Sequence, residues 1–255
     1  MIILKTNAEI EKMRVAGRVV ADALTMLTES IVPDRTTTGD LDRLADEFLA
    51  IRGAVPSFKG YRGYPATVCV AVNEEVVHGI PGSRVLKSGD IIGIDLGAVV
   101  DGFQGDSAVT VAVGQISAEA ERLLRIGRES LFAGIRQARV GNRLTDISSA
   151  IQQYAESHGY SVVRDLVGHG IGRDMHEDPQ VPNFGRPGRG PRLEAGMTLA
   201  IEPMVNIGGH QVEGLPDRWT IVTRDRSLSA HWEHTVAVTK SGPDILTLRE
   251  GESPI

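Results

Sequence analysis

Two acidic residues stand in an apolar stretch of this 255-residue chain, where their charges need a cation. The segment VVDGFQGD places Asp101-Gly102 between two strand-like runs, which is typical of a two-residue hairpin turn. Gly97 would then pair with Asp106, and Asp95 would lie one diagonal step from Asp106 on the same face, with their backbones about 7–8 Å apart. No Lys or Arg is near in sequence, and two buried acids without a positive partner cost several kcal/mol. The hairpin therefore predicts a metal site; the alternative is two surface acids on an exposed sheet face.

The second half of the chain adds further candidate ligands. VGHGIGRDMHEDP places His169 and His176 around a glycine-rich turn, AIEPM puts Glu202 at a strand end, and AHWEHTVAVT puts Glu233 on one face of a strand. Each alone has an ordinary interpretation, as a core histidine or as an acid that protects a sheet edge. Together, four carboxylates and an imidazole indicate Mn, Fe(II), Co or Zn. Two such ions about 3.5–4 Å apart would generate a hydroxide nucleophile and polarise a carbonyl.

Other catalytic motifs are missing from the sequence. GHGIG is neither a GxGxxG fingerprint nor a phosphate-binding loop, and no G-x-S-x-G elbow occurs. The single cysteine, Cys69, excludes an intrachain disulfide, and it is a weak candidate for a nucleophile. These absences leave metal-assisted hydrolysis as the favoured chemistry.

Composition limits the class of protein. With 41% hydrophobic and 24% charged residues, the chain is an ordinary globular protein and not a disordered one. Its net charge of −6 argues against dedicated nucleic-acid binding. The N-terminal MIILKTNAEIEKMR has too few consecutive apolar residues for a signal peptide, and no apolar run is long enough to span a membrane. We expect a cytoplasmic protein without a membrane partner.

The elements that must position these side chains occur twice along the chain. Periodicity predicts helices at 7–30, capped by Asn7, and at 40–51, strands at 66–72, 91–96 and 106–113, and then helices at 118–137 and 144–157. AEIEKMRVAGR resembles AEAERLLRIGR, and LKSGDIIGID resembles LEAGMTLAIE, in the same order and at nearly the same spacing. Chance similarity is one interpretation. The other is two halves related by a pseudo-twofold axis, with a ligand site between them.

These residues, in this order, resemble the type I methionine aminopeptidases. The similarity is carried by NEEVVHGIP (73–81), GIDLGAVVDGFQGD (93–106), GHGIGRDMHEDPQVP (168–182), AIEPM (200–204) and DRSLSAHWEHT (225–235). The order Asp, Asp, His, Glu, Glu is specific for the superfamily with the pita-bread fold, and VHGIP and RSLSAxxEHT narrow it to methionine removal. The resemblance implies an α+β fold, with duplicated halves and a curved antiparallel sheet covered by helices. It also implies one catalytic domain over 1–255, with halves at roughly 7–115 and 117–245.

The resemblance also implies the role of each site residue. Two divalent ions would be held by Asp95, Asp106, His169, Glu202 and Glu233, with Asp106 and Glu233 bridging them. Glu202 would shuttle a proton for the bridging water, His78 would hydrogen-bond the substrate near the scissile amide, and His176 would contact its carbonyl. Tyr61, Tyr64, Cys69 and Trp219 would line a methionine pocket. The substrate would be the N-terminal peptide of a nascent protein with a small second residue, and we expect a monomer.

Several positions depart from the family pattern or leave alternatives open. Met175 stands where the family often has an aromatic residue, Val77 where it commonly has a cysteine, and Gln104 where it often has a histidine. None of the three is a metal ligand, so these departures concern the substrate pocket. The segment RPGRGPR (186–192) is interpreted as an exposed loop; the second interpretation is a transient contact with the ribosome. Two rival functions are a proline-directed peptidase, which usually carries an additional N-terminal domain, and a non-enzymatic relative, which would have lost metal ligands.

Overall fold

The centre of the structure, a computed structural model that describes residues 1–253, is the hairpin of β4 (Ile91–Val100) and β5 (Phe103–Ala112). Asp101 and Gly102 form its turn with φ of 51° and 74°, and two positive φ values are what a two-residue turn of the right twist requires. Gly97 pairs with Asp106, which confirms the predicted register. On its other side β4 pairs with β1 (Val55–Pro56) and β2 (Val68–Val72), so the strand that carries Asp95 lies inside a sheet.

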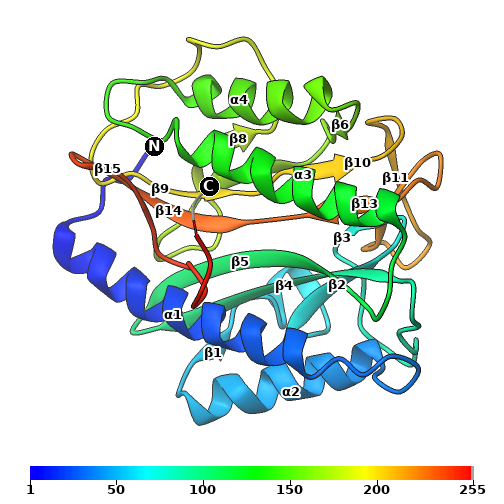
Figure 1. Cartoon of the computed structure of the whole chain (residues 1–255). Coiled ribbons are helices and arrows are strands. Elements are labelled where there is room, and N and C mark those ends of the chain that lie inside the picture. The colour runs from blue at the N-terminus through cyan, green and yellow to red at the C-terminus, as the bar shows by residue number, and fades with distance from the viewer. Residues whose placement is uncertain (254–255) are drawn as a thin grey trace.

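Helix α1 (Asn7–Glu29) covers this sheet together with α2 (Thr38–Ile51), as Figure 1 shows. The prediction that Asn7 caps α1 is wrong, because Thr6 is the extended cap residue. The Thr6 hydroxyl accepts from the Glu9 N–H, and the Glu9 carboxylate accepts from the Thr6 N–H. This reciprocal pair satisfies two free N–H groups at once, which favours Thr6 over its neighbour.

Close packing of α1 on β5 requires glycine at the contact. A Cβ on Gly105 would lie 2.6 Å from the backbone nitrogen of Gly17, which is closer than van der Waals contact allows. The two backbones therefore approach directly, and α1 lies close against the strand that carries Asp106.

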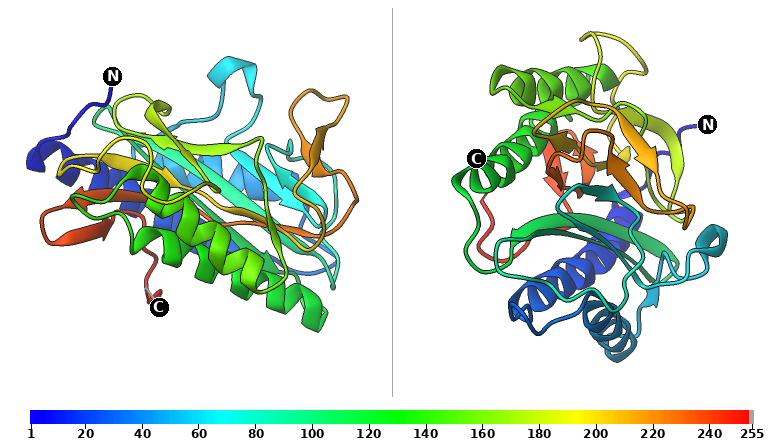
Figure 2. Two further views of the ribbon diagram at one scale, coloured as in Figure 1. Left: turned by 90° about the horizontal axis from the view of Figure 1, so that it is seen from above. Right: turned by 90° about the vertical axis from the view of Figure 1, so that its right-hand side faces the viewer.

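The second half repeats this scheme. Helices α3 (Ala118–Ile135) and α4 (Leu144–Ser157) pack against each other beside a second antiparallel sheet. Its strand order is β15 (Gly242–Ile245), β14 (His234–Thr239), β9 (Thr198–Ile201), β7 (Val167–Gly170) and β8 (Glu177–Pro182). Figure 2 shows the two helix pairs on opposite outer faces, with strands of both halves between them.

Shorter strands complete the fold. One small sheet contains β6 (Ser161–Val162), β10 (Met204–Asn206) and β13 (Ser229–His231), and another contains β3 (Glu75–Val77), β11 (Val212–Gly214) and β12 (Ile221–Thr223). A short 3-10 turn, Tyr61–Gly63, lies in the loop between β1 and β2. Within residues 1–253, the structure has no helix with the length and apolar surface needed to cross a membrane.

Side-chain hydroxyls join the halves where their central strands meet. Ser107 Oγ donates to the carbonyl of Glu233 (2.6 Å), and Thr110 Oγ1 donates to that of His231 (2.7 Å). Thr235 Oγ1 donates to the Asp106 carbonyl (2.8 Å) and accepts from the Asp106 N–H (3.1 Å). These bonds satisfy buried polar groups, and they hold the strands that carry Asp106 and Glu233 against each other.

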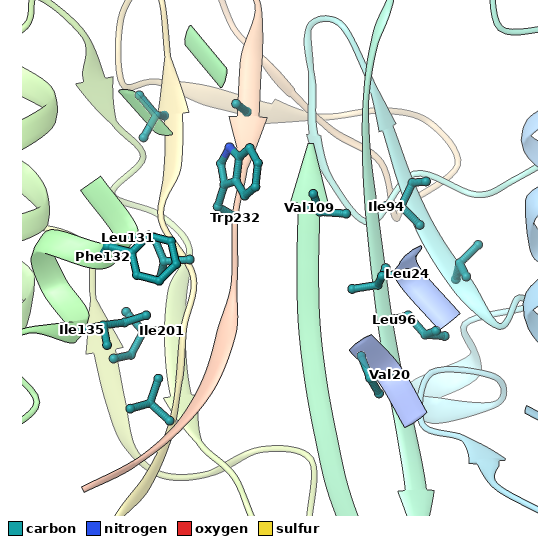
Figure 3. Close-up of a cluster of buried hydrophobic side chains, with 14 of the residues drawn as sticks. Val20, Leu24, Ile94, Leu96, Val109, Leu131, Phe132, Ile135, Ile201 and Trp232 are labelled. Carbon is teal, nitrogen blue, oxygen red and sulfur yellow. The ribbon is translucent and has the colours of Figure 1, made fainter. Parts of the chain in front are cut away.

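A common hydrophobic core supports this junction from both sides. Figure 3 shows Leu24, Ile94 and Leu96 on the side of the first half, and Phe132 and Ile201 on the side of the second. All five belong to one cluster of buried side chains and are at most 1% exposed. The region between the halves is therefore held by packed layers and not by loops alone.

Candidate metal centre

The predicted site residues gather around one cavity of about 170 Å³ between the two halves. Its walls include all five predicted metal ligands and all six predicted substrate-contacting residues: Asp95, Asp106, His169, Glu202, Glu233, His78, His176, Tyr61, Tyr64, Cys69 and Trp219. Phe58, Arg62 and Met175 complete the lining. Residues that are far apart in the chain therefore share one small space.

Each half contributes acids to this space from its central strands. Asp95 lies on β4 and Asp106 on β5, while Glu202 follows directly after β9 and Glu233 lies between β13 and β14. His169 is part of β7. One ligand atom each of Asp106, His169 and Glu233 lies within 4.8 Å of the others, a spacing that allows a shared cation.

His169 presents a free nitrogen to the acids. Its Nδ1 lies 2.8 Å from the Gly170 carbonyl, which can only accept, so Nδ1 carries the hydrogen. Nε2 is left with a lone pair and lies 3.6 Å from Glu202 Oε1. Burial, and next the nearby His176, lower the pKa of His169 to about 4, so the ring is neutral at pH 7. A neutral imidazole oriented by its second nitrogen is the usual form of a metal-binding histidine.

The carboxylates repel one another in a site from which water is largely excluded. Burial is the main cause that raises the pKa of Asp95, Glu202 and Glu233 well above the ordinary value, and the neighbouring acids add to it. Burial also raises the pKa of Asp106 to about 7. Within residues 1–253, no Lys or Arg forms an ion pair with any of the four acids. The only basic side chains within ion-pair distance of them are two histidines, and both lie beside Glu202.

A divalent cation fits this donor set. Asp95 Oδ1, Asp106 Oδ1 and Glu233 Oε1 are buried and have no hydrogen-bond partner. Buried oxygens of this kind normally bind a donor or a metal, and oxygen ligands with one imidazole suit Mn, Fe, Co or Zn. The fit supports the use of divalent metal at this position.

An apolar pocket adjoins the acids. Phe58, Tyr64, Cys69 and Met175 form a buried cluster, and Trp219 packs edge-on against Tyr64 with 5.0 Å between the ring centroids. Burial is the main cause that raises the pKa of the Cys69 thiol well above its usual value, so the thiol stays protonated and is a poor nucleophile. Met175, a departure from the family pattern, therefore serves as part of the apolar wall.

Two histidines stand at the boundary between pocket and acids. His176 stacks on Tyr61 with 5.3 Å between ring centroids, and its Nδ1 lies 3.0 Å from the Tyr61 hydroxyl. His78 has a φ of 61°, a left-handed conformation that is unusual for a residue other than glycine and often occurs at functional sites. Both have a lowered pKa, with burial as the main cause, so both are neutral near pH 7.

The sequence interpretation missed His231. Its Nε2 lies 3.6 Å from Glu202 Oε2 and has no hydrogen-bond partner, and its side chain is 3% exposed. Glu202 therefore has a histidine beside each of its oxygens. The signal was present, because His231 precedes Glu233 by two positions in an alternating segment and so faces the same side.

Comparison with known proteins identifies the family. A model of metallopeptidase family M24 matches residues 11–240. The chain belongs to this family. Methionine aminopeptidase of Clostridium perfringens is 60% identical, over 97% of this chain and 99% of its own length. The crystal structure of methionine aminopeptidase from Thermotoga maritima is 49% identical and has a TM-score of 0.95, covering 98% of this chain and 100% of that chain. These relatives confirm the resemblance to methionine aminopeptidases.

A more distant structure shares the fold of this chain. Prolidase from Pyrococcus horikoshii has a TM-score of 0.80 at 22% identity, and the match covers 98% of this chain and 65% of that chain. At this identity the similarity concerns the fold alone. The predicted α+β pita-bread fold, with helices covering the strands of two similar halves, is confirmed by these structures together.

We expect Asp106→Asn to lose bound metal. The amide removes a charge and leaves one good oxygen donor where the predicted bridge needs two. Elemental analysis of the purified variant measures this, with Asp101→Asn, on the exposed turn of the same hairpin, as the matched control. An unchanged metal stoichiometry in Asp106→Asn would contradict the ligand assignment.

We also expect the metal-free protein to lose stability through Asp106 as pH rises. The pKa of Asp106 is about 7 in the folded state, against an ordinary 3.8 when unfolded. Between these values the folded state keeps a proton that the unfolded state has released, so the free energy of unfolding falls with increasing pH and levels off above about 7. Denaturant unfolding of metal-free wild type and Asp106→Asn, compared at each pH, measures this contribution together with the effect of Asp106 on the neighbouring acids. A difference that stays constant as pH rises through this interval would refute it.

Proposed function

We propose that this M24 peptidase removes the N-terminal methionine of nascent proteins whose second residue is small. The observation that carries the proposal is the contact between an apolar pocket and a cluster of buried acids in one cavity. A methionine side chain needs an apolar pocket, and the amide that follows it must reach the acids. The similarity to methionine aminopeptidases over nearly the whole chain supports this interpretation.

Each residue of the site would have a separate role in metal binding, proton transfer or substrate binding. Asp95, Asp106, His169, Glu202 and Glu233 would hold two divalent ions, which when bound supply an activated water and a polarised carbonyl. Glu202, with a histidine beside each of its oxygens, would accept a proton from the attacking water and return it to the leaving amine. His78 would hold the scissile amide, and His176 would donate to the carbonyl oxygen as charge develops on it. Tyr61, Tyr64, Cys69 and Trp219 would hold the methionine side chain.

The proposal extends to the setting of the enzyme. Residues 1–255 would form one catalytic domain with halves at roughly 7–115 and 117–245, and the protein would act as a monomer in the cytoplasm. Its partner would be the N-terminal peptide of a growing chain, and the loop 186–192 is a candidate for a transient ribosome contact. Mn, Fe, Co and Zn are the candidate ions.

A comparison of three peptides tests the function. With each metal added in turn to metal-stripped enzyme, Met-Ala-Ser should be cleaved. Met-Ile-Ser should react more slowly, because a β-branched second side chain overpacks a tight site at a cost of about 1–3 kcal/mol, which corresponds to roughly 5- to 150-fold in rate. Ala-Pro-Pro should not be cleaved. Preferred cleavage of Ala-Pro-Pro would favour a proline-directed peptidase instead.

His176→Ala should separate catalysis from metal binding. The variant should keep its metal while kcat falls by roughly 10²–10³, the usual effect of removing one donor to a developing oxyanion. Metal content and steady-state kinetics are measured together, with His158→Ala, at the end of α4, as the control. Loss of metal from His176→Ala would make His176 a ligand and the assignment wrong.

A further inference from the structure

The turn between β7 and β8, residues 171–176, carries His176 and is held by the next residue in the chain. Glu177, the first residue of β8, turns its Oε1 back to the start of the turn, where it accepts from the Arg173 N–H (3.0 Å) and the Asp174 N–H (3.4 Å). The Gly172 N–H donates to the Asp174 carbonyl within the same turn (3.1 Å). These bonds hold the backbone of the turn that leads to His176.

The second oxygen of Glu177 is held from the N-terminal arm, residues 1–5. Lys5 Nζ forms an ion pair with Glu177 Oε2, and the two side chains are only 4% and 5% exposed. Lys5 is itself anchored, since its N–H donates to the Gly196 carbonyl (2.7 Å) and its Nζ donates to the Ile3 carbonyl (3.1 Å). The pair is therefore a buried charge contact between segments 172 positions apart.

Glycine in the turn makes this contact sterically feasible. A Cβ on Gly172 would overlap both Lys5 Cε and Glu177 Oε1. The lysine stem therefore passes directly over the backbone of the turn. The Gly172 carbonyl also accepts from the Gln104 N–H (2.8 Å), so the turn is held by β5 as well as by the arm.

On its other side the turn faces the cavity. Met175 and His176 both line the cavity, and the His176 ring lies 4.2 Å from that of His169, centroid to centroid. None of the five predicted metal ligands belongs to the turn. The turn therefore carries substrate-contacting residues and no predicted ligand.

We propose that the buried Lys5–Glu177 ion pair positions His176 for catalysis, which makes the N-terminal arm part of the active-site framework. Without Lys5, the Glu177 carboxylate is a buried charge with no cation beside it, and such a charge is drawn towards water. A shift of the carboxylate weakens its bonds to the Arg173 and Asp174 N–H groups, and His176 moves with the turn. The inference rests on the proposed function, because the role of His176 in peptide hydrolysis is part of it.

Two uncharged double variants test the positioning without leaving a buried charge. Lys5→Met/Glu177→Gln keeps an oxygen that can accept from the turn, and Lys5→Met/Glu177→Met keeps the side-chain length but offers no such acceptor. The Gln variant should keep most of the wild-type kcat on Met-Ala-Ser. The Met variant should lose about 10- to 100-fold in kcat, the scale expected when a catalytic group is misplaced by about 1 Å. Metal affinity, measured by calorimetry, should be unchanged in both.

The single variant Lys5→Met should fall below Lys5→Met/Glu177→Gln in kcat, because only the single variant leaves the carboxylate unpaired. Lys240→Met, which changes an exposed lysine on the turn after β14, is the matched control and should behave as wild type. Equal kcat values for the two double variants, or a loss of metal in both, would overturn the proposal.

A second experiment tests whether the change in kcat depends on the His176 side chain. In a His176→Ala background, the difference in kcat between the two double variants should disappear, because the positioned side chain is gone. A purely structural role would instead lower stability and leave the same kcat ratio in both backgrounds, and that result would refute the inference. If the wild-type enzyme cleaves Met-Ala-Ser with none of the four metals, the proposed function is refuted. If the wild type and Lys240→Met cleave it but the two double variants have equal kcat values, only the positioning proposal is refuted.

Discussion

The mutual repulsion of four buried carboxylates is the constraint on which the rest of the structure depends. Asp95, Asp106, Glu202 and Glu233 share a space from which water is largely excluded, and burial raises the pKa of each. A fold keeps such a cluster only if its scaffold is stiff enough to prevent the acids from turning out to solvent. A cation then binds to oxygens that are already in place, and little conformational entropy is lost on binding.

The stiffness comes from the way the two halves meet. Each half covers its strands with a helix pair, and the hydrophobic clusters of both halves merge at the centre. Between β5 and the chain from β13 to β14, hydroxyls of Ser107, Thr110 and Thr235 donate to backbone carbonyls, beside a direct backbone bond from the Glu233 N–H to the Ala108 carbonyl. Side chains at Asp106 and Glu233 can therefore converge, because their backbones are fixed to each other at adjacent positions.

The pocket wall is held differently from the metal centre. The predicted ligands come from strands and strand ends, whereas Tyr61, Met175 and His176 come from loops and turns. These segments are held by contacts behind them: Gln104 accepts from the Ser57 hydroxyl (2.6 Å) and donates to the Arg173 carbonyl (3.3 Å), and Glu177 accepts from the N–H groups of the turn before His176. Gln104, a departure from the family pattern, thus links the loop before Phe58 to the turn that carries His176.

The sequence by itself determined the local features of this protein. Alternation along the strands and the Asp101-Gly102 turn determined the register that places Asp95 and Asp106 on one face, because both are short-range effects of backbone geometry. The helices were predicted within a few residues for the same reason, and only the cap at Thr6 was misplaced. The motifs also named most of the residues that line the cavity.

Only the tertiary structure decided which distant groups touch. His231 beside Glu202, Lys5 against Glu177, and Gln104 between two loops follow from how layers pack, and no periodicity along the chain encodes such pairs. His231 and Glu202 each had a local signal, but nothing along the chain indicated that the two would lie side by side. Lys5 had none, since a lysine near the start of a chain is ordinarily solvated and becomes buried only where another segment brings a carboxylate and a glycine to meet it.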